Sequence, residues 1–208
     1  VSIRELTDTM GPFQILFFRS LVGLVTVVAA AAAMGRLGDL RSGQLRLQLF
    51  RNTIHYGGQW FWAFGVAALP FATVFALEFT TPAWAALLAV LFLGERMRRG
   101  RLVSLLCGLA GVALILRPGM EAVSIAALAV LLAAFCYAIS HVCTKKLTRT
   151  DGVFAIIFWM SFLQLPMGLI PSLFDWSPVE TSDILPIIAV GLSALGAHYG
   201  LSNALRRA

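Results

Sequence analysis

Seven stretches of apolar residues, separated by short polar segments, make up the hydropathy pattern of the chain. A helix of about 20 apolar residues, rising about 1.5 Å per residue, crosses the roughly 30 Å hydrocarbon core of a membrane. The pattern therefore predicts an all-α polytopic membrane protein. Its seven predicted transmembrane helices are residues 13–34, 52–69, 71–93, 102–116, 122–144, 153–174 and 184–205.

The basic residues between these stretches predict how the helices are oriented. Thirteen of the sixteen Lys and Arg residues fall in alternate loops. Because cytoplasmic loops carry an excess of Lys and Arg, the segments 36–51, 96–101, 145–149 and 206–207 are expected in the cytoplasm. The acidic segment 175–183 is then expected outside.

A connector and the start of the helix that follows it occur twice. Residues 1–20 align with residues 142–161 at a shift of 141, and nine of the twenty positions are identical. Five predicted spans separate the copies, so the second copy should have the opposite orientation. The number of Lys and Arg in the connector rises from one to three, as a move to the cytoplasmic side requires. The sequence thus predicts two inverted repeats, an architecture typical of secondary transporters.

The repeat also sets the expected domains. The first five-helix repeat should cover residues 1–118 without its first helix, and the second should cover residues 119–208 without its last two. The seven visible helices would then belong to a protein of ten.

Composition and charge agree with a membrane protein. The 208 residues are 59% hydrophobic and 12% charged, with a formal net charge of +6. The basic residues separate apolar runs and form no solvated face, so a nucleic-acid partner is not expected. Cys107, Cys136 and Cys143 show no metal-type spacing, and neither a metal nor a cofactor is expected. The expected partners are the lipid bilayer and a small-molecule substrate, with a homodimer left open.

Glu78 is the first candidate for chemistry because it lies inside an apolar span, where an ionised carboxylate needs pairing, hydration or protonation. Pro82, four residues on, cannot donate a hydrogen bond to the Glu78 carbonyl and predicts a helix break. Substrate binding or proton coupling is one interpretation, and a structural kink with a paired acid is the other. Arg19 is expected at the same depth and is the predicted partner, although it could instead reach outward to the membrane surface.

A His-Tyr pair that occurs twice and two tryptophans are weaker candidates for substrate contact. His55-Tyr56 and His198-Tyr199 lie in corresponding spans, but at a shift of 143. Each His could be a proton relay, a hydrogen-bonded core residue or a residue at the membrane boundary. Trp60 and Trp84 could form an aromatic wall for an organic solute or anchor their helices in lipid.

The chain resembles the EamA-type family of the drug/metabolite transporter superfamily. The resemblance covers essentially the whole chain, and an LGER motif beside a cytoplasmic loop is its most specific part. The matching segments are Phe17-Phe18-Arg19, Ala67-Ala68-Leu69-Pro70, Glu78-Phe79-Thr80-Thr81-Pro82-Ala83-Trp84-Ala85-Ala86-Leu87, Leu93-Gly94-Glu95-Arg96 and Leu114-Ile115-Leu116-Arg117-Pro118. The resemblance implies ten helices in two inverted halves around a central cavity, in the cytoplasmic (inner) membrane.

A secondary transporter of small organic metabolites or drugs is therefore the predicted function, as an exporter or exchanger working by alternating access. The alternative is an intramembrane enzyme or a receptor-like protein without transport activity. An intramembrane hydrolase needs a nucleophile with a base or paired carboxylates, and the spans contain no such set. The protein is accordingly not expected to be an enzyme.

Overall fold

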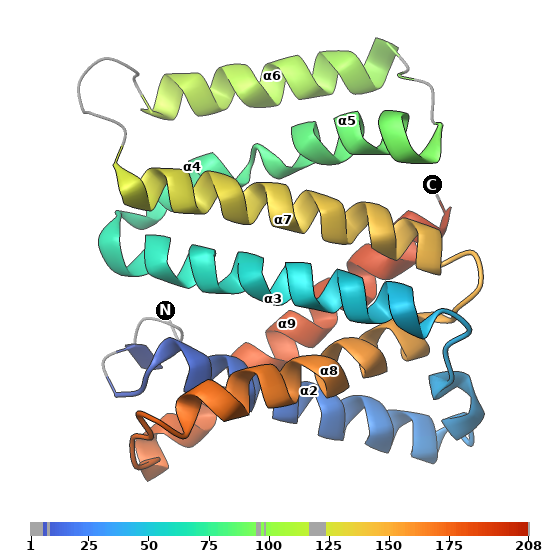
Figure 1. Ribbon diagram of the computed structural model, residues 1–208, viewed down its shortest axis with the longest axis vertical. Helices are drawn as coiled ribbons and strands as arrows, with labels where there is room; N and C mark the ends of the chain where they lie inside the picture. Colours follow the sequence, from blue (N-terminus) through green and yellow to red (C-terminus); the bar gives the residue numbers. More distant parts are fainter. Residues whose placement is uncertain (1–5, 8, 95–96, 98, 117–123, 208) are drawn as a thin grey trace. The chain divides into compact units, whose positions relative to one another are not determined.

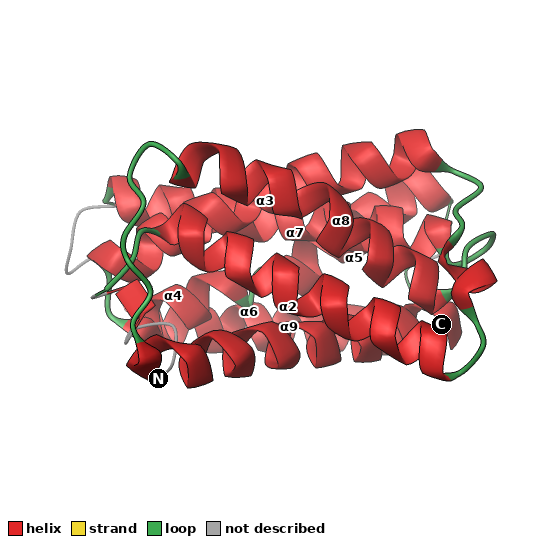
Figure 2. Cartoon of the chain, turned by 90° about the horizontal axis from the view of Figure 1, so that it is seen from below, coloured by secondary structure: helices red, strands yellow, loops and turns green. Residues whose placement is uncertain are grey.

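The computed structural model describes residues 6–7, 9–94, 97, 99–116 and 124–207. Within these residues the regular structure is helical (Figures 1 and 2). The elements are α2 (Pro12–Ala33), the 3₁₀ helix η1 (Leu37–Leu40), α3 (Leu45–Ala68), α4 (Phe71–Glu78), α5 (Thr81–Leu93), α6 (Arg99–Leu116), α7 (Ile125–Leu147), α8 (Val153–Ser172) and α9 (Thr181–Arg207).

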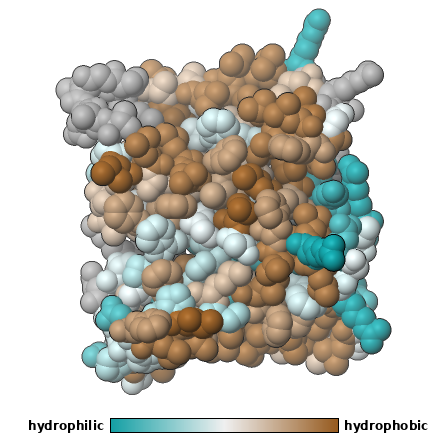
Figure 3. Space-filling view, in the orientation of Figure 1, coloured by the Kyte–Doolittle hydropathy of each residue, from teal (hydrophilic) through white to brown (hydrophobic). Residues whose placement is uncertain are grey.

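Five helical segments are long and apolar enough to cross a membrane, which makes the chain a multi-pass membrane protein. They are Pro12–Ala33, Phe71–Leu93, Ile125–Leu147, Val153–Ser172 and Thr181–Arg207. The other two predicted spans are also helical. In α6 only the shorter segment Leu105–Leu114 is apolar throughout, and α3 is interrupted by polar residues that it buries. Hydrophobic side chains cover most of the face shown in Figure 3, as lipid contact requires.

The described chain divides into two compact units, and each is described here by itself. Unit 1 comprises Val1–Asn52 and Thr144–Ala208, and unit 2 comprises Thr53–Cys143. The helices α3 and α7 contribute residues to both units.

In unit 1, α2 packs against α8 and α9 at glycine contacts. A Cβ atom added to Gly168 of α8 would lie 2.8 Å from the backbone nitrogen of Phe17, and one added to Gly191 of α9 would lie 2.5 Å from Val22. The start of α2 meets the α8–α9 connection, where Gln14 bonds Ser177. Val27, near the end of α2, packs against Val153 and Ile157 at the start of α8, so the two helices run antiparallel.

The repeated connector forms the same turn at both ends of unit 1. Before α2, the amides of Thr9 and Met10 donate to the Leu6 carbonyl at 3.2 and 2.9 Å. Before α8, the amides at positions 150 and 151 donate to the Leu147 carbonyl at 3.0 and 2.8 Å. The N-cap glycines also match, with φ −67° and ψ 156° at position 11 and φ −69° and ψ 159° at position 152.

Unit 2 has its core where α3, α4 and α7 meet. Val74, Leu77 and Val130 are buried there. Gly58 and Gly65 let α3 approach α7 closely, because a Cβ at either position would lie within 3 Å of an α7 side chain. α6 lies against α4 and α5.

Gly168→Ala should destabilise unit 1, because its methyl group would meet the backbone of Phe17, which cannot move aside. We expect a loss of about 1–3 kcal/mol, measured as a lower melting temperature of the full-length protein in detergent. Gly196→Ala is the matched control, since its Cβ meets nothing within 4 Å and alanine favours helix by up to about 1 kcal/mol. Equal melting temperatures for the two variants would contradict the close α2–α8 contact.

Candidate functional site

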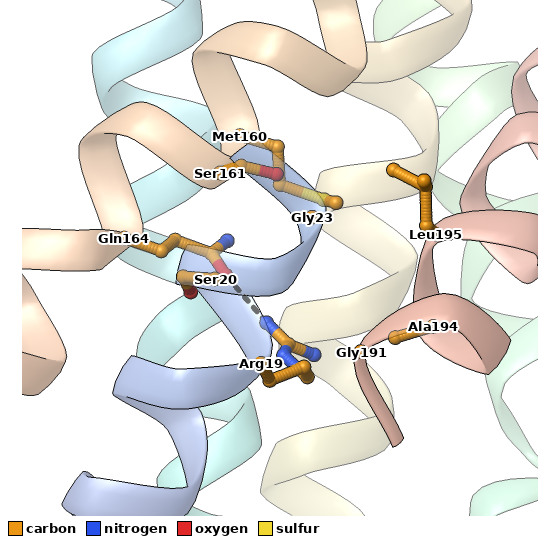
Figure 4. A pocket seen from close by; sticks show the side chains of 9 residues that line it. All are labelled: Arg19, Ser20, Gly23, Met160, Ser161, Gln164, Gly191, Ala194 and Leu195. Atoms are coloured by element: carbon orange, nitrogen blue, oxygen red, sulfur yellow. Dashed lines mark hydrogen bonds between the residues drawn. The ribbon is translucent and has the colours of Figure 1, made fainter. Parts of the chain in front are cut away.

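A small pocket of about 10 Å³, which is room for about one water molecule, lies within unit 1 between α2, α8 and α9 (Figure 4). It is lined by Arg19, Ser20, Gly23, Met160, Ser161, Gln164, Gly191, Ala194 and Leu195. The side chain of Arg19 points toward Gln164, and its Nη2 donates to Oε1 of Gln164 at 2.7 Å. Arg19 was predicted as a site residue, and Gln164 was not. This pocket therefore holds a cation and a fully buried amide inside two candidate membrane spans.

The α2 and α8 residues of the pocket are related by the sequence repeat. At the shift of 141, Arg19 corresponds to Met160, Ser20 to Ser161, and position 23 to position 164. All six line the pocket. The pocket thus lies where the two copies of the repeated helix start face each other.

A chain of polar contacts leads away from Gln164 along α3. Gln164 Nε2 donates to Oδ1 of Asn52 at 3.3 Å, and Asn52 Nδ2 donates to the Gln48 carbonyl at 2.8 Å. Arg51 Nη1 lies 3.4 Å from the same Asn52 oxygen. Each of these side chains is at most 2% exposed. We call Gln48, Arg51, Asn52 and Gln164 the polar chain.

The polar chain ends at Asp151, in the turn before α8. The Asp151 carboxylate accepts hydrogen bonds from Gln48 Nε2 at 3.1 Å, from the Gly43 amide at 3.2 Å and from the Ser42 hydroxyl. Asp151 is only 4% exposed. These bonds tie the α2–α3 connection to the α7–α8 connection at one end of unit 1.

Sequence reasoning missed these residues, although α3 carries a signal that could have found them. Gln48, Asn52, His55 and Gln59 are spaced i, i+4, i+7 and i+11, which places them on one face of a helix. All four are buried. In a membrane helix a polar face points into the protein, so the spacing indicates an interior lining.

Glu78 lies in unit 2 at the end of α4, and its carboxylate accepts a hydrogen bond from Nε1 of Trp62 at 2.8 Å. The helix breaks after it, as Pro82 predicted, and α5 begins at Thr81. The Thr80 hydroxyl donates to the Leu77 carbonyl at 2.7 Å, which gives one backbone carbonyl at the helix break a hydrogen-bond donor. The predicted pairing of Arg19 with Glu78 stays a prediction, because the two residues belong to different units.

The remaining predicted residues lie in different surroundings. His55 and Tyr56 are buried, and the His55 ring lies 5.2 Å from the ring of Tyr137. Trp84 lies 5.5 Å from the Phe135 ring at 86°, whereas Trp60 is 42% exposed.

The second His-Tyr pair, on α9, is more exposed than the first. His198 is half-buried and Tyr199 is 50% exposed. Tyr199 lines a surface pocket of unit 1 with Arg36 and Arg206.

Glu95 and Arg96 of the LGER motif, and part of the first connector, lie outside the described residues. Among the described residues, no group of three or more His, Cys, Asp or Glu could hold a metal ion.

Comparison with known proteins finds relatives that are named as transporters. The S-adenosylmethionine uptake transporter of Rickettsia bellii is 23% identical over 193 residues, which are 93% of this chain and 66% of that protein. The riboflavin transporter of Rhizobium johnstonii is 33% identical over 144 residues, which are 69% of this chain and 48% of that protein. The chain thus spans less than two thirds of the length of these two relatives.

A solved structure and a family model also match the chain. A protein of known crystal structure, 20% identical, matches with a TM-score of 0.74 over 94% of this chain and 70% of its own. The EamA-like transporter family matches residues 1–117, more than half of the chain. The chain therefore belongs to the EamA-like transporter family.

Proposed function

We propose that this chain is part of a secondary transporter that carries a small organic metabolite across the cytoplasmic membrane by alternating access. The observation that carries the proposal is the connector turn, which has the same hydrogen bonds and N-cap geometry at opposite ends of unit 1. In an inverted repeat, the two copies of a turn lie at opposite ends, and the helices that follow the two turns run antiparallel. Inverted repeats supply the two exchangeable halves that alternating access uses.

Tertiary contacts of the two turns support the same interpretation. At one end Thr9 donates to the Asp183 carboxylate at 3.0 Å. At the other end Ser42, which lies 141 residues before Asp183, bonds Asp151. Asp151 corresponds to Met10, the neighbour of Thr9, so the two contacts are offset by one residue but join the corresponding segments. We infer repeats at 1–118 and 119–208 in a protein of ten helices.

Polar groups inside the spans favour a solute with hydrogen-bonding or charged groups. Arg19 and Gln164 lie inside membrane spans, where such residues mark a solute pathway more often than a lipid-facing surface. The relatives named above carry S-adenosylmethionine and riboflavin by name. Both compounds are organic metabolites with a nitrogen heteroaromatic ring, and this class is our proposal for the substrate.

Counterflow in vesicles tests transport directly. The full-length protein is reconstituted, the vesicles are loaded with unlabelled riboflavin or S-adenosylmethionine, and the entry of labelled solute is followed. A transporter exchanges the solute chemically unchanged and in both directions. An intramembrane enzyme would leave a chemically altered product, and a receptor would bind solute without exchange.

The orientation can be checked by labelling intact cells. In a variant in which Cys107, Cys136 and Cys143 are replaced by Ser, single cysteines are placed at the exposed positions Arg149 and Glu180. The positive-inside rule predicts that an impermeant maleimide labels position 180 and not position 149. Labelling at position 149 alone would reverse the orientation of every span.

A further inference from the structure

The Gln59 side chain of α3 is a buried amide without a hydrogen-bond partner in the part of the chain that the structure describes. It is 4% exposed, and both Nε2 and Oε1 are buried and unbonded. Nearly all buried amides in folded proteins are hydrogen-bonded, because losing water without a replacement is costly. The environment of Gln59 is therefore complete only when another group bonds the amide.

A second buried glutamine shows the ordinary arrangement. Gln14 of α2 is 1% exposed, its Nε2 donates to the Ser177 carbonyl at 2.8 Å, and its Oε1 accepts from the Ser177 amide at 3.0 Å. Both of its polar atoms are satisfied by the protein. Gln14 is thus a structural amide, and Gln59 differs from it because no described residue bonds either of its polar atoms.

The helix register places a second unsatisfied group at the level of Gln59. Trp62 and Glu78 are each eight residues from Pro70, and they are hydrogen-bonded. Gln59 lies one turn from Trp62 on α3, and Thr81, the first residue of α5, follows Glu78 across the helix break, so both lie next to the bonded pair at about the same level. The Thr81 hydroxyl is also buried and unbonded among the described residues. Two polar groups thus share one level of unit 2 at the α4–α5 break.

Aromatic rings lie beside this level. Trp84, three residues after Thr81, contacts the ring of Phe135 of α7. α7 approaches α3 here, because a Cβ atom on Gly58 would lie 2.9 Å from Cys136. The helices α5 and α7, which carry Trp84 and Phe135, thus supply aromatic surface for a planar solute in this part of unit 2.

We propose that the Gln59 amide, with the Thr81 hydroxyl, binds the edge of a planar heteroaromatic ring that carries a hydrogen-bond donor next to an acceptor. A primary amide presents a donor and an acceptor side by side and pairs with such an edge through two bonds. The proposal rests on the proposed transport function and names a recognition point for its substrate. Because Pro82 lacks an amide hydrogen, the joint between α4 and α5 can bend to admit the solute.

Gln59→Leu tests the proposal with Gln14→Leu as the matched control, both in the full-length protein in vesicles. The probes are riboflavin and 3-methylriboflavin, in which a methyl group replaces the imide hydrogen. We expect wild type to prefer riboflavin, and Gln59→Leu to lose about tenfold or more of its riboflavin affinity and the preference itself. Its melting temperature should stay unchanged or rise, because an unbonded amide has been removed. Gln14→Leu should lower the melting temperature and keep the preference.

The outcomes separate the possibilities. An unchanged preference in Gln59→Leu would show that the amide holds only an internal water, and the proposal would fall. S-adenosylmethionine and its analogue dimethylated on the adenine amino group form a second pair of probes. If the protein exchanges other solutes but neither ring, the proposal is wrong and transport stands. If it exchanges no solute, the transport function fails. Thr81→Val gives an independent measure of the preference should Gln59→Leu not fold.

Discussion

Asp151→Ala should lower the free energy of unfolding of the full-length protein by about 3 kcal/mol, because hydrogen bonds to a charged group each contribute about 1.5–3 kcal/mol and are not fully additive. The substitution leaves donors from Ser42, Gly43 and Gln48 without their acceptor. Gln48 is 0% exposed, so water cannot easily replace the carboxylate there. The loss is measured as a lower melting temperature in detergent.

Two variants show whether this loss belongs to the hydrogen bonds. Asp175→Ala removes an aspartate from the exposed α8–α9 connection and should change the melting temperature little. Asp151→Asn keeps the shape of the side chain but turns one acceptor into a donor that faces other donors. It should therefore lower the free energy of unfolding by nearly as much as Asp151→Ala does. If Asp151→Asn is as stable as wild type, the carboxylate does not hold the two connections together.

The sequence predicted the helices well because hydropathy is a property of whole segments. All seven predicted stretches contain helix, and the break at Pro82 falls where its missing amide hydrogen requires. The repeated connector was visible because Leu6, Thr9 and Gly11 have counterparts 141 residues on. These residues form the turn itself, so sequence identity and local geometry coincide.

The polar chain could not be derived from hydropathy alone. A single glutamine in an apolar run, such as Gln164, hardly changes the average of its segment. Its bonds to Arg19 and Asn52 join α8 to α2 and α3, and depend on which helices pack together. Matching charges by depth pointed only to Glu78 as a partner for Arg19. A neutral amide also bonds a guanidinium, and such partners need the tertiary structure or a search for polar residues on one helix face.

Glu78→Gln should abolish uptake driven by a pH gradient, with at least a tenfold loss of initial rate, while leaving exchange of solute in place. The Glu78 carboxylate can take up and release a proton, whereas a glutamine amide cannot. A pH gradient drives net proton movement, and solute exchange needs none. The amide keeps an oxygen that can accept the Trp62 bond, so the variant should fold. The measurement compares gradient-driven uptake with counterflow in the same vesicles.

Trp62→Phe separates coupling from structure at this site. It removes the hydrogen bond to Glu78 but leaves the carboxylate, so gradient-driven uptake should persist with an altered pH profile. A structural acid would behave in the opposite way: Glu78→Gln would transport with an unchanged pH dependence, and Trp62→Phe would have the larger effect through lost packing beside Leu77. The helix break supports the coupling role, because Pro82 cannot bond the Glu78 carbonyl and the side chain lies at a joint that can change its surroundings. An acid that must meet solvent or solute in one state and be closed off in another is best placed at such a joint.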